Sequence, residues 1–181
     1  MRGAPRSPAR CGSGTSSSSA EPGRDKHPAV VVTWYGAKAY CDQHGLALPT
    51  EAPWEYAARG RQSLRFPWGD DWDAMKCCNG SNRGTGNPPT MEVGSTVAGS
   101  SWCGVADMVG NVWEWCADRY DEGYYAASPT EDPTGPASGT GRLLRGGSFY
   151  GDPLTCRSAC RGRAALGGRG DKQGFRVATT P

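Results

Sequence analysis

The sequence predicts a single small α+β domain built from two helices, short strands and much irregular chain. Glycine and proline are frequent, with 27 and 14 copies among 181 residues, which places turns throughout and argues against a helical bundle or a doubly wound sheet. Helical patterns are confined to residues 33–60, and short strand-like segments follow after residue 110. Seven Trp and seven Tyr supply much of the apolar mass.

The composition excludes several classes of partner. The formal net charge of +2 gives no electrostatic argument for binding nucleic acid or a membrane surface. No apolar run is long enough to span a bilayer, and no signal peptide is visible at the start. The eight cysteines show neither a CxxC pair nor a Cys/His array, so we expect buried free thiols rather than a zinc site. The compartment stays open, with cell surface and secretion among the alternatives.

The start of the chain differs in character from the rest. Residues 1–26 are rich in Ser, Gly, Pro and Arg and carry no hydrophobic period, so we expect a disordered low-complexity tail. The remainder, residues 27–181, has the length of one domain. We expect this domain to be monomeric or part of a larger chain.

Near the start of the domain, a capping residue and a terminating glycine stand about one helix length apart. Three valines at 30–32 predict a strand or an extended entry. Thr33 can then cap a helix that runs to Asp42 or His44, and Gly45 stands where a helix terminator belongs.

A second helix and three strands complete the expected elements. Thr50 is the next cap, and this helix should end at Gly60. Strands are predicted over 112–115, which alternates apolar and polar residues, and over 142–148 and 174–178. The segments 60–103, 119–141 and 149–173 are predicted as long loops, which in small domains usually carry function.

Three sequence blocks resemble one known family. They are the run from His27-Pro28 through Leu48–Gly60, the block Gly110-Asn111-Val112-Trp113-Glu114-Trp115, and Arg145–Ser148 with Gly174–Arg176. Their order and spacing are similar to those of the sulfatase-modifying, or formylglycine-generating enzyme, family over about residues 27–178. The resemblance implies a C-type-lectin-like fold with two helices on small twisted antiparallel sheets. It also implies further elements upstream of residue 27, so we expect the domain to lack its usual N-terminal part.

The catalytic pattern of that family is incomplete here. Members that oxidise a substrate cysteine to formylglycine use two cysteines, five positions apart, whose soft thiolates suit Cu(I). The resemblance places Gly151 at the first of these positions and Cys156 at the second, while Cys160 has the wrong spacing. Ser148 matches an active-site serine of the family. We therefore expect remnants rather than an intact site, and no copper; an oxidase or a degenerate relative of one is the alternative.

The segment 149–173 also resembles the mutable loop of variable proteins of diversity-generating retroelements, which share this fold. A fixed frame alternates there with variable positions whose side chains would contact a protein or glycan ligand. The alternative is an ordinary irregular loop in a noncatalytic family member. The frame would be Pro153, Cys156, Arg157, Ser158, Ala159, Arg161, Arg169 and Gly174–Arg176, and the variable positions would be Tyr150, Gly151, Asp152, Leu154, Thr155, Cys160, Gly162, Arg163, Gly168, Gly170 and Asp171.

A calcium site is also implied by the resemblance. Its carboxylates would come from Asp107 and Glu114, and its main-chain oxygens from Gly110 and Val112. Hard oxygen ligands of this kind suit calcium. The alternatives remain a turn cap for Asp107 and, for Glu114, a salt bridge to an arginine, either Arg145 or Arg176.

Overall fold

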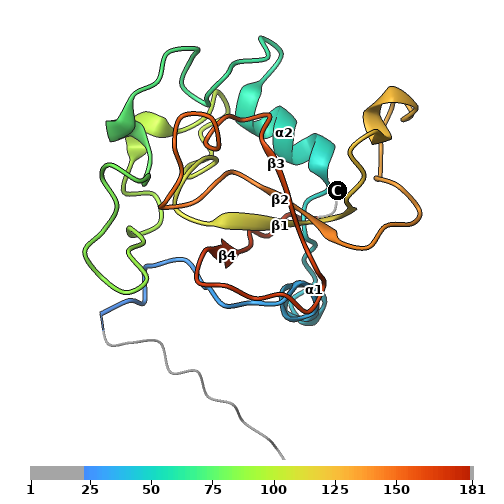
Figure 1. Ribbon diagram of the computed structural model, residues 1–181, viewed down its shortest axis with the longest axis horizontal. Helices are drawn as coiled ribbons and strands as arrows, with labels where there is room; N and C mark the ends of the chain where they lie inside the picture. The colour runs from blue at the N-terminus through green and yellow to red at the C-terminus, as the bar shows by residue number, and fades with distance from the viewer. Residues whose placement is uncertain (1–22, 180–181) are drawn as a thin grey trace, which may run out of the picture.

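A computed structural model describes residues 23–179, in which one four-stranded sheet lies between two helices (Figure 1). The strand order is β3-β2-β1-β4. The expected α+β class is confirmed. The helices are α1 (Trp34–Gln43) and α2 (Glu51–Arg59), and the strands are β1 (Trp113–Arg119), β2 (Arg142–Arg145), β3 (Arg161–Ala164) and β4 (Gln173–Gly174).

Both helices begin and end where their capping residues predict. The Thr33 hydroxyl accepts a hydrogen bond from the Gly36 N–H at 3.1 Å, which caps α1. Gly45 and Gly60 follow the two helices with φ of 66° and 61°, in the left-handed region that favours glycine. The three valines before α1 form neither a strand nor a continuous extended entry, because the chain bends at Val31, whose φ of 58° lies in the left-handed region.

The sheet is mixed rather than purely antiparallel. β1 pairs antiparallel with β2 and β2 with β3, but β1 runs parallel to β4 over two residue pairs. β2 ends at Arg145, short of the expected Ser148, because Gly146 and Gly147 leave the extended region with φ of 96° and 78°. The last expected strand is reduced to β4 and an isolated bridge between Ala178 and Ala47.

The third strand lies inside a segment predicted as loop, and that prediction is wrong for Arg161–Ala164. The sequence Arg-Gly-Arg-Ala shows no apolar alternation. It is extended because β2 supplies its hydrogen-bonding edge, with Leu144 opposite Gly162 and Arg145 opposite Arg161.

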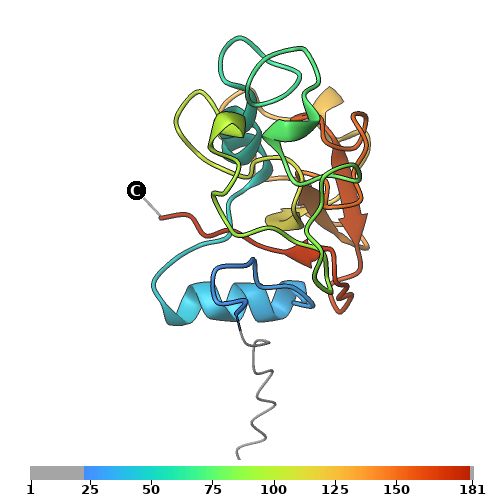
Figure 2. The same ribbon diagram turned by 90° about the vertical axis from the view of Figure 1, so that its left-hand side faces the viewer.

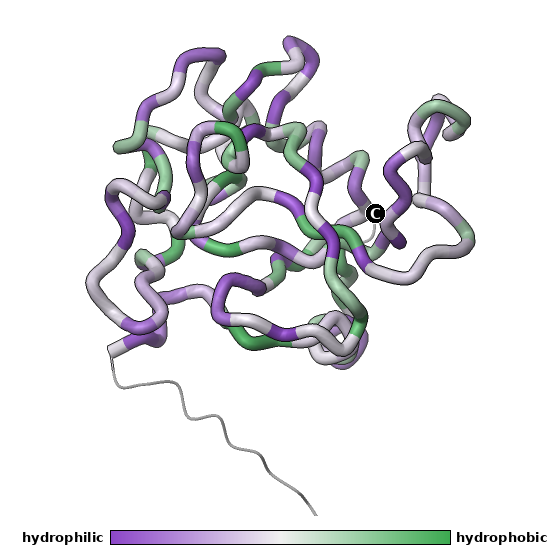
Figure 3. The backbone as a smooth tube through the Cα atoms, viewed as in Figure 1, coloured by the Kyte–Doolittle hydropathy of each residue, from purple (hydrophilic) through white to green (hydrophobic). Residues whose placement is uncertain are grey.

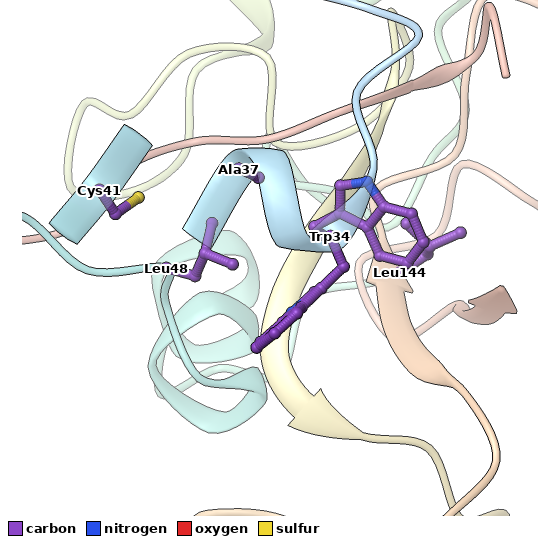
Figure 4. Packing of buried hydrophobic residues seen from close by; sticks show 6 residues of the cluster. Trp34, Ala37, Cys41, Leu48 and Leu144 are labelled. Carbon is purple, nitrogen blue, oxygen red and sulfur yellow. The ribbon is translucent and has the colours of Figure 1, made fainter. Parts of the chain in front are cut away.

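Two apolar clusters fill the space on the two faces of the sheet. On one face α1 packs through Trp34, Ala37 and Cys41 against Trp115 and Leu144 (Figure 4). On the other face the cluster is made by the buried residues Trp54, Ala58, Met108, Cys116 and Leu143. Because β1 and β2 alternate their side chains, each strand serves both clusters.

Long irregular segments cover one end of the sheet, above and beside α2 (Figure 2). They contain three short 3₁₀ helices, Ala74–Lys76, Val97–Gly99 and Tyr124–Ala126. Hydrophilic and hydrophobic residues follow one another in short stretches, both in the strands and in the loops (Figure 3). Between residues 23 and 179 no helix has both the length and the apolar character that a bilayer crossing requires.

Residues 23–26, which the sequence assigned to the disordered tail, are folded against the domain. Most of the expected disordered tail, residues 1–22, lies outside the described residues. Residues 23–26 form a turn against the segment 88–93. There Arg24 donates to the Pro88 carbonyl and the Thr90 hydroxyl, and the Val93 N–H donates to the Lys26 carbonyl at 2.8 Å.

Candidate functional site

A hollow of about 440 Å³ opens on the sheet at the segment 149–173. Every strand contributes to it, together with the turn that leads into β4. Four of the positions predicted to contact a ligand line it, and four further residues complete it. The first four are Gly162, Arg163, Gly170 and Asp171, and the others are Trp113, Leu144, Lys172 and Gln173.

The floor of the hollow depends on the absence of a side chain at Gly162. A Cβ atom there would lie 3.1 Å from Trp113 Cζ3 and 3.4 Å from Leu144 Cβ. The Trp113 indole therefore reaches across β2 to the backbone of β3. The resulting surface is apolar and partly exposed, and it suits contact with a flat apolar group.

The rim of the hollow is polar and carries both signs of charge. Arg163, Asp171 and Lys172 are exposed, so their charged groups are open to a partner. The Gln173 Oε1 atom is buried without a hydrogen-bond partner among the described residues. A buried acceptor of this kind gains most from a donor on a bound ligand.

Tyr150 extends the hollow into a larger surface. The Lys172 ammonium lies 4.5 Å from the centre of its ring, and the Arg83 guanidinium lies 4.6 Å from it. Such cation–π contacts hold an exposed aromatic ring in place. Tyr150 is 50% exposed and Leu154 63% exposed, so both side chains offer apolar area to a partner.

The predicted ligand-contacting positions divide into three kinds. Tyr150, Leu154, Arg163 and Asp171 are exposed and free to contact a ligand. A second group, whose members are half-buried, contributes mainly backbone or partial contacts. This group consists of Cys160, Gly162, Gly168 and Gly170.

The third kind comprises positions that shape the loop itself. Asp152 Oδ1 accepts hydrogen bonds from the N–H groups of Leu154 and Thr155 and from the Thr155 hydroxyl. The bonds from Thr155 lower the pKa of Asp152. Gly151 is buried, contrary to its place among the variable positions. A Cβ atom there would lie 2.4 Å from Cys156 Sγ, so the position has no room for a side chain unless its neighbours move.

Two arginines anchor this segment to the sheet and to α2. Buried Arg145 donates to the carbonyls of Ser158 and Cys160 at 3.0 and 2.7 Å. Arg161 donates to both carboxylate oxygens of Glu51, at 2.7 and 3.0 Å. Arg161 thus has the frame role that its sequence position predicted. Arg145 has a similar role that the sequence did not reveal.

The catalytic remnants do not form the family's copper pair. Position 151 carries no side chain, and the side chain of Ser148 is buried with its hydroxyl accepting from the Tyr150 N–H at 3.3 Å. The thiol that interacts with Cys156 comes from Cys77, and this contact raises the pKa of Cys156, as does burial. As the family places them, the copper ligands do not fit this chain.

Two of the residues expected to bind calcium, Asp107 and Glu114, contact an arginine instead. Arg176 donates to both oxygens of Glu114 at 2.6 and 2.7 Å, and to the carbonyls of Ala106 and Asp107 at 3.2 Å. The guanidinium thus takes oxygens of the kind that calcium would need. The carboxylate of Asp107 caps a turn by accepting from the Gly94 N–H at 2.6 Å. Because both expected carboxylates are engaged in this way, the arrangement does not fit calcium, and the sequence-based expectation of a calcium site awaits a binding measurement.

Two further hollows, of about 470 and 320 Å³, flank α2 and share Ala52 and Tyr56. Neither is lined by a residue of the segment 149–173. The sequence singled out no functional residue there, so we place the candidate binding surface at the hollow over Trp113 and Gly162.

Sequence reasoning missed several members of the site. Trp113, Lys172 and Gln173 line the hollow but are not among the positions that the sequence predicted to contact a ligand. Strand pairing brings two of these residues together, because Trp113 lies opposite Gln173 where β1 runs parallel to β4.

A family model and several known proteins match this chain. The model of the sulfatase-modifying factor enzyme 1-like domain matches residues 4–181. The formylglycine-generating enzyme of Streptomyces coelicolor is 41% identical over 168 residues, which cover 86% of this chain and 54% of that protein. The chain therefore spans about half the length of this relative.

Two solved structures share the fold. Treponema denticola variable protein 1 superposes with a TM-score of 0.78 at 29% identity, covering 86% of this chain and 72% of that one. PvdO from Pseudomonas aeruginosa gives a TM-score of 0.69 at 30% identity, covering 84% and 61%. The expected C-type-lectin-like fold of the formylglycine-generating enzyme type is confirmed. Because the family model matches nearly all of the chain, the chain belongs to the sulfatase-modifying factor enzyme 1-like domain family.

Proposed function

We propose that this domain is a noncatalytic recognition module whose ligand surface is the hollow over Trp113 and Gly162 together with Tyr150 and Leu154. The observation that carries the proposal is the gathering of Gly162, Arg163, Gly170 and Asp171 around one hollow that all four strands support. The likeness to Treponema denticola variable protein 1 supports it.

The chemistry of the surface favours a ligand with mixed character. The indole of Trp113 and the ring of Tyr150 offer flat apolar area, and such aromatic groups often dominate binding energy in protein interfaces. Arg163 and Lys172 offer charged donors, and Asp171 offers an acceptor. A protein segment or a glycan could each satisfy these groups, and we propose one of them as the partner.

The test first identifies a ligand and then locates its binding surface with variants. Purified protein is screened against a peptide display library and a glycan array, and the best binder is titrated by calorimetry. We expect Arg163→Ala and Lys172→Ala to weaken binding at least tenfold. Arg61→Ala, an exposed arginine beside α2, serves as the matched control and should bind like the parent. Equal affinity in all four proteins would place the ligand surface elsewhere.

The proposed variability has its own test. If the segment belongs to a diversity-generating retroelement, the surrounding DNA should hold a reverse-transcriptase gene and a near-repeat of codons 149–173. Related genomes should then differ at codons 150, 154, 163 and 171, where side chains are exposed, and not at codon 151. Variation that falls mainly on the buried positions would contradict this part of the proposal.

The second candidate is an oxidase that converts a substrate cysteine to formylglycine. The 41% identity to the formylglycine-generating enzyme of Streptomyces coelicolor favours it. Gly151 opposes it, because the first of the two copper-binding cysteines would have to stand there. We expect no aldehyde product when the protein is incubated with a Cys-x-Pro-x-Arg peptide and Cu(I). Mass-spectrometric detection of formylglycine above trace yield would support the oxidase instead.

A further inference from the structure

Cys77 and Cys156 lie in one small buried cluster although they are far apart in the sequence. The cluster also contains Val109, and Trp68 and Trp72 pack against it. The two cysteines are 2% and 0% exposed. Neither contributes to the ligand surface or to the two larger apolar clusters.

The two side chains belong to the same buried cluster, and each thiol shifts the pKa of the other: Cys156 lowers the pKa of Cys77, and Cys77 raises that of Cys156. The Asn79 side-chain amide donates to Cys77 Sγ, at 3.7 Å. The backbone fixes Cys156 Sγ closely, since a Cβ atom at Gly147 would lie 3.3 Å from it. A hydrogen bond of 3.0 Å from the Gly80 N–H to the Gly151 carbonyl joins the loops that carry the two cysteines.

This pair differs from the other cysteines that the structure describes. Cys41 and Cys116 are buried in separate clusters, and burial raises the pKa of both. Cys103 is exposed. At Cys77 the neighbouring Cys156 and the hydrogen bond from Asn79 outweigh burial and lower the pKa of the thiol. Since the thiolate is the reactive form, this order of pKa values favours Cys77 over Cys156 as the first thiol to react.

We propose that Cys77 and Cys156 form a site of reversible oxidation, at which a peroxide closes the two thiols into an intrachain disulfide. The Cys77 thiolate attacks one peroxide oxygen, so that an S–O bond forms, the O–O bond breaks and water leaves after protonation. The Cys156 sulfur then attacks the sulfenic acid, so that the S–S bond forms and a second water leaves. Two thiols lose two electrons, and one hydrogen peroxide becomes two waters.

The disulfide would tie the loop of residues 77–82 to the segment that carries Tyr150 and Leu154. Such a cross-link restricts the unfolded chain, so the oxidised protein should melt at a higher temperature. Hydrogen peroxide is close in size to water, and local opening of the loops is enough to admit it. The inference is independent of the proposed recognition function.

The experiment maps the bond in the full chain. The protein is treated with hydrogen peroxide, denatured in N-ethylmaleimide and digested with trypsin, which cleaves after Lys76, Arg83, Arg145 and Arg157. We expect a cross-linked pair of the peptides 77–83 and 146–157, released by reductant. Cys160 falls in a different peptide, 158–161, so the assignment of Cys156 is unambiguous.

Two variants separate the neighbouring thiols and keep the test decisive. Cys78→Ser should keep the cross-link and its rise in melting temperature, whereas Cys77→Ser should lose both. If Cys77→Ser fails to fold, fragment ions of the parent peptide still distinguish Cys77 from Cys78. A bond through Cys78 or Cys160 would overturn the proposal. So would recovery of alkylated Cys77 and Cys156 at a peroxide dose that oxidises the exposed Cys103.

Discussion

The guanidinium of Arg176 and the carboxylate of Glu114 meet through two parallel hydrogen bonds of 2.6 and 2.7 Å. Glu114 lies in the middle of the sheet, and its second neighbour there is the Trp54 indole N–H, also at 2.6 Å. The carboxylate is 7% exposed and the guanidinium 23% exposed. Burial lowers the pKa of Arg176, but the Glu114 carboxylate more than offsets this effect, so the pKa of Arg176 rises overall.

Removing one member of this pair should be costly. Arg176→Met leaves a buried carboxylate without its cation, and breaking such pairs typically costs about 3–5 kcal/mol of unfolding free energy. Chemical denaturation of parent and variant measures the difference. A matched control is Lys38→Met, which removes an exposed pair on α1 and should cost less than about 1 kcal/mol. Similar losses in the two variants would contradict the role given to Arg176.

The ion pair of Arg176 and Glu114 also bears on whether calcium binds at Glu114. Calcium at Glu114 would have to displace the guanidinium, so we expect the melting temperature to be equal in chelator and in millimolar calcium. The measurement is a thermal melt of the parent and of Glu114→Gln under both conditions. A rise with calcium in the parent that disappears in Glu114→Gln would establish the site and contradict this expectation.

Arg161 and Arg163 sit two residues apart on β3 and should respond differently to substitution. Arg161→Ala leaves the buried Glu51 carboxylate without its strongest partner, so we expect a loss of about 3 kcal/mol. Arg163→Ala removes an exposed side chain whose described contact is the Tyr120 ring at 5.3 Å, worth about 0.5–1 kcal/mol. Urea titrations compare the two. Equal losses would show that the division between anchoring and exposed residues is wrong.

Asp118 makes stability depend on pH in an unusual direction. Burial raises the pKa of its carboxyl to about 6, and the Glu51 carboxylate adds to the rise, while a hydrogen bond from the Glu51 N–H and the charge of Arg142 oppose it. Because the folded pKa exceeds the unfolded one, the folded state binds the proton more tightly. The contribution of protonated Asp118 to the free energy of unfolding is therefore present below about pH 4 and is lost as the pH rises through about 6.

The variant Asp118→Asn isolates this effect. The stability of the parent relative to the variant should fall by about 2 kcal/mol between pH 4 and pH 7, since each pKa unit corresponds to about 1.4 kcal/mol. Unfolding curves at both pH values, for both proteins, give the difference directly. A constant difference, or one that grows with pH, would contradict the assignment to Asp118.

Local signals predicted the helices well, because Thr33, Gly45 and Gly60 act through neighbouring backbone groups. The alternative pairing of Glu114 with Arg176 also followed from strand adjacency. β3 escaped prediction because its extended shape comes from pairing with β2, and four residues without alternation give no local signal.

Parts of the candidate site depend on tertiary contacts that spacing cannot show. Gly151 looked like a variable position, yet the fold turns it inward against Cys156. The contact of Cys77 with Cys156 joins two loops that lie far apart in the sequence. The hollow itself exists because Trp113 crosses to Gly162, which neither residue's neighbours indicate.

The central claim is that exposed side chains of the segment 149–173 bind a ligand while the frame holds the fold. The most direct measurement compares the affinity and the melting of a combined variant in which Tyr150, Leu154, Arg163 and Asp171 are replaced by Ala. The account predicts loss of binding to the peptide or glycan selected by the screen, with at most about 2 kcal/mol lost in stability. A control with Tyr35, Arg61, Met75 and Val97 replaced, all exposed elsewhere, should bind normally. Undiminished binding by the first variant, or its unfolding, would contradict the account.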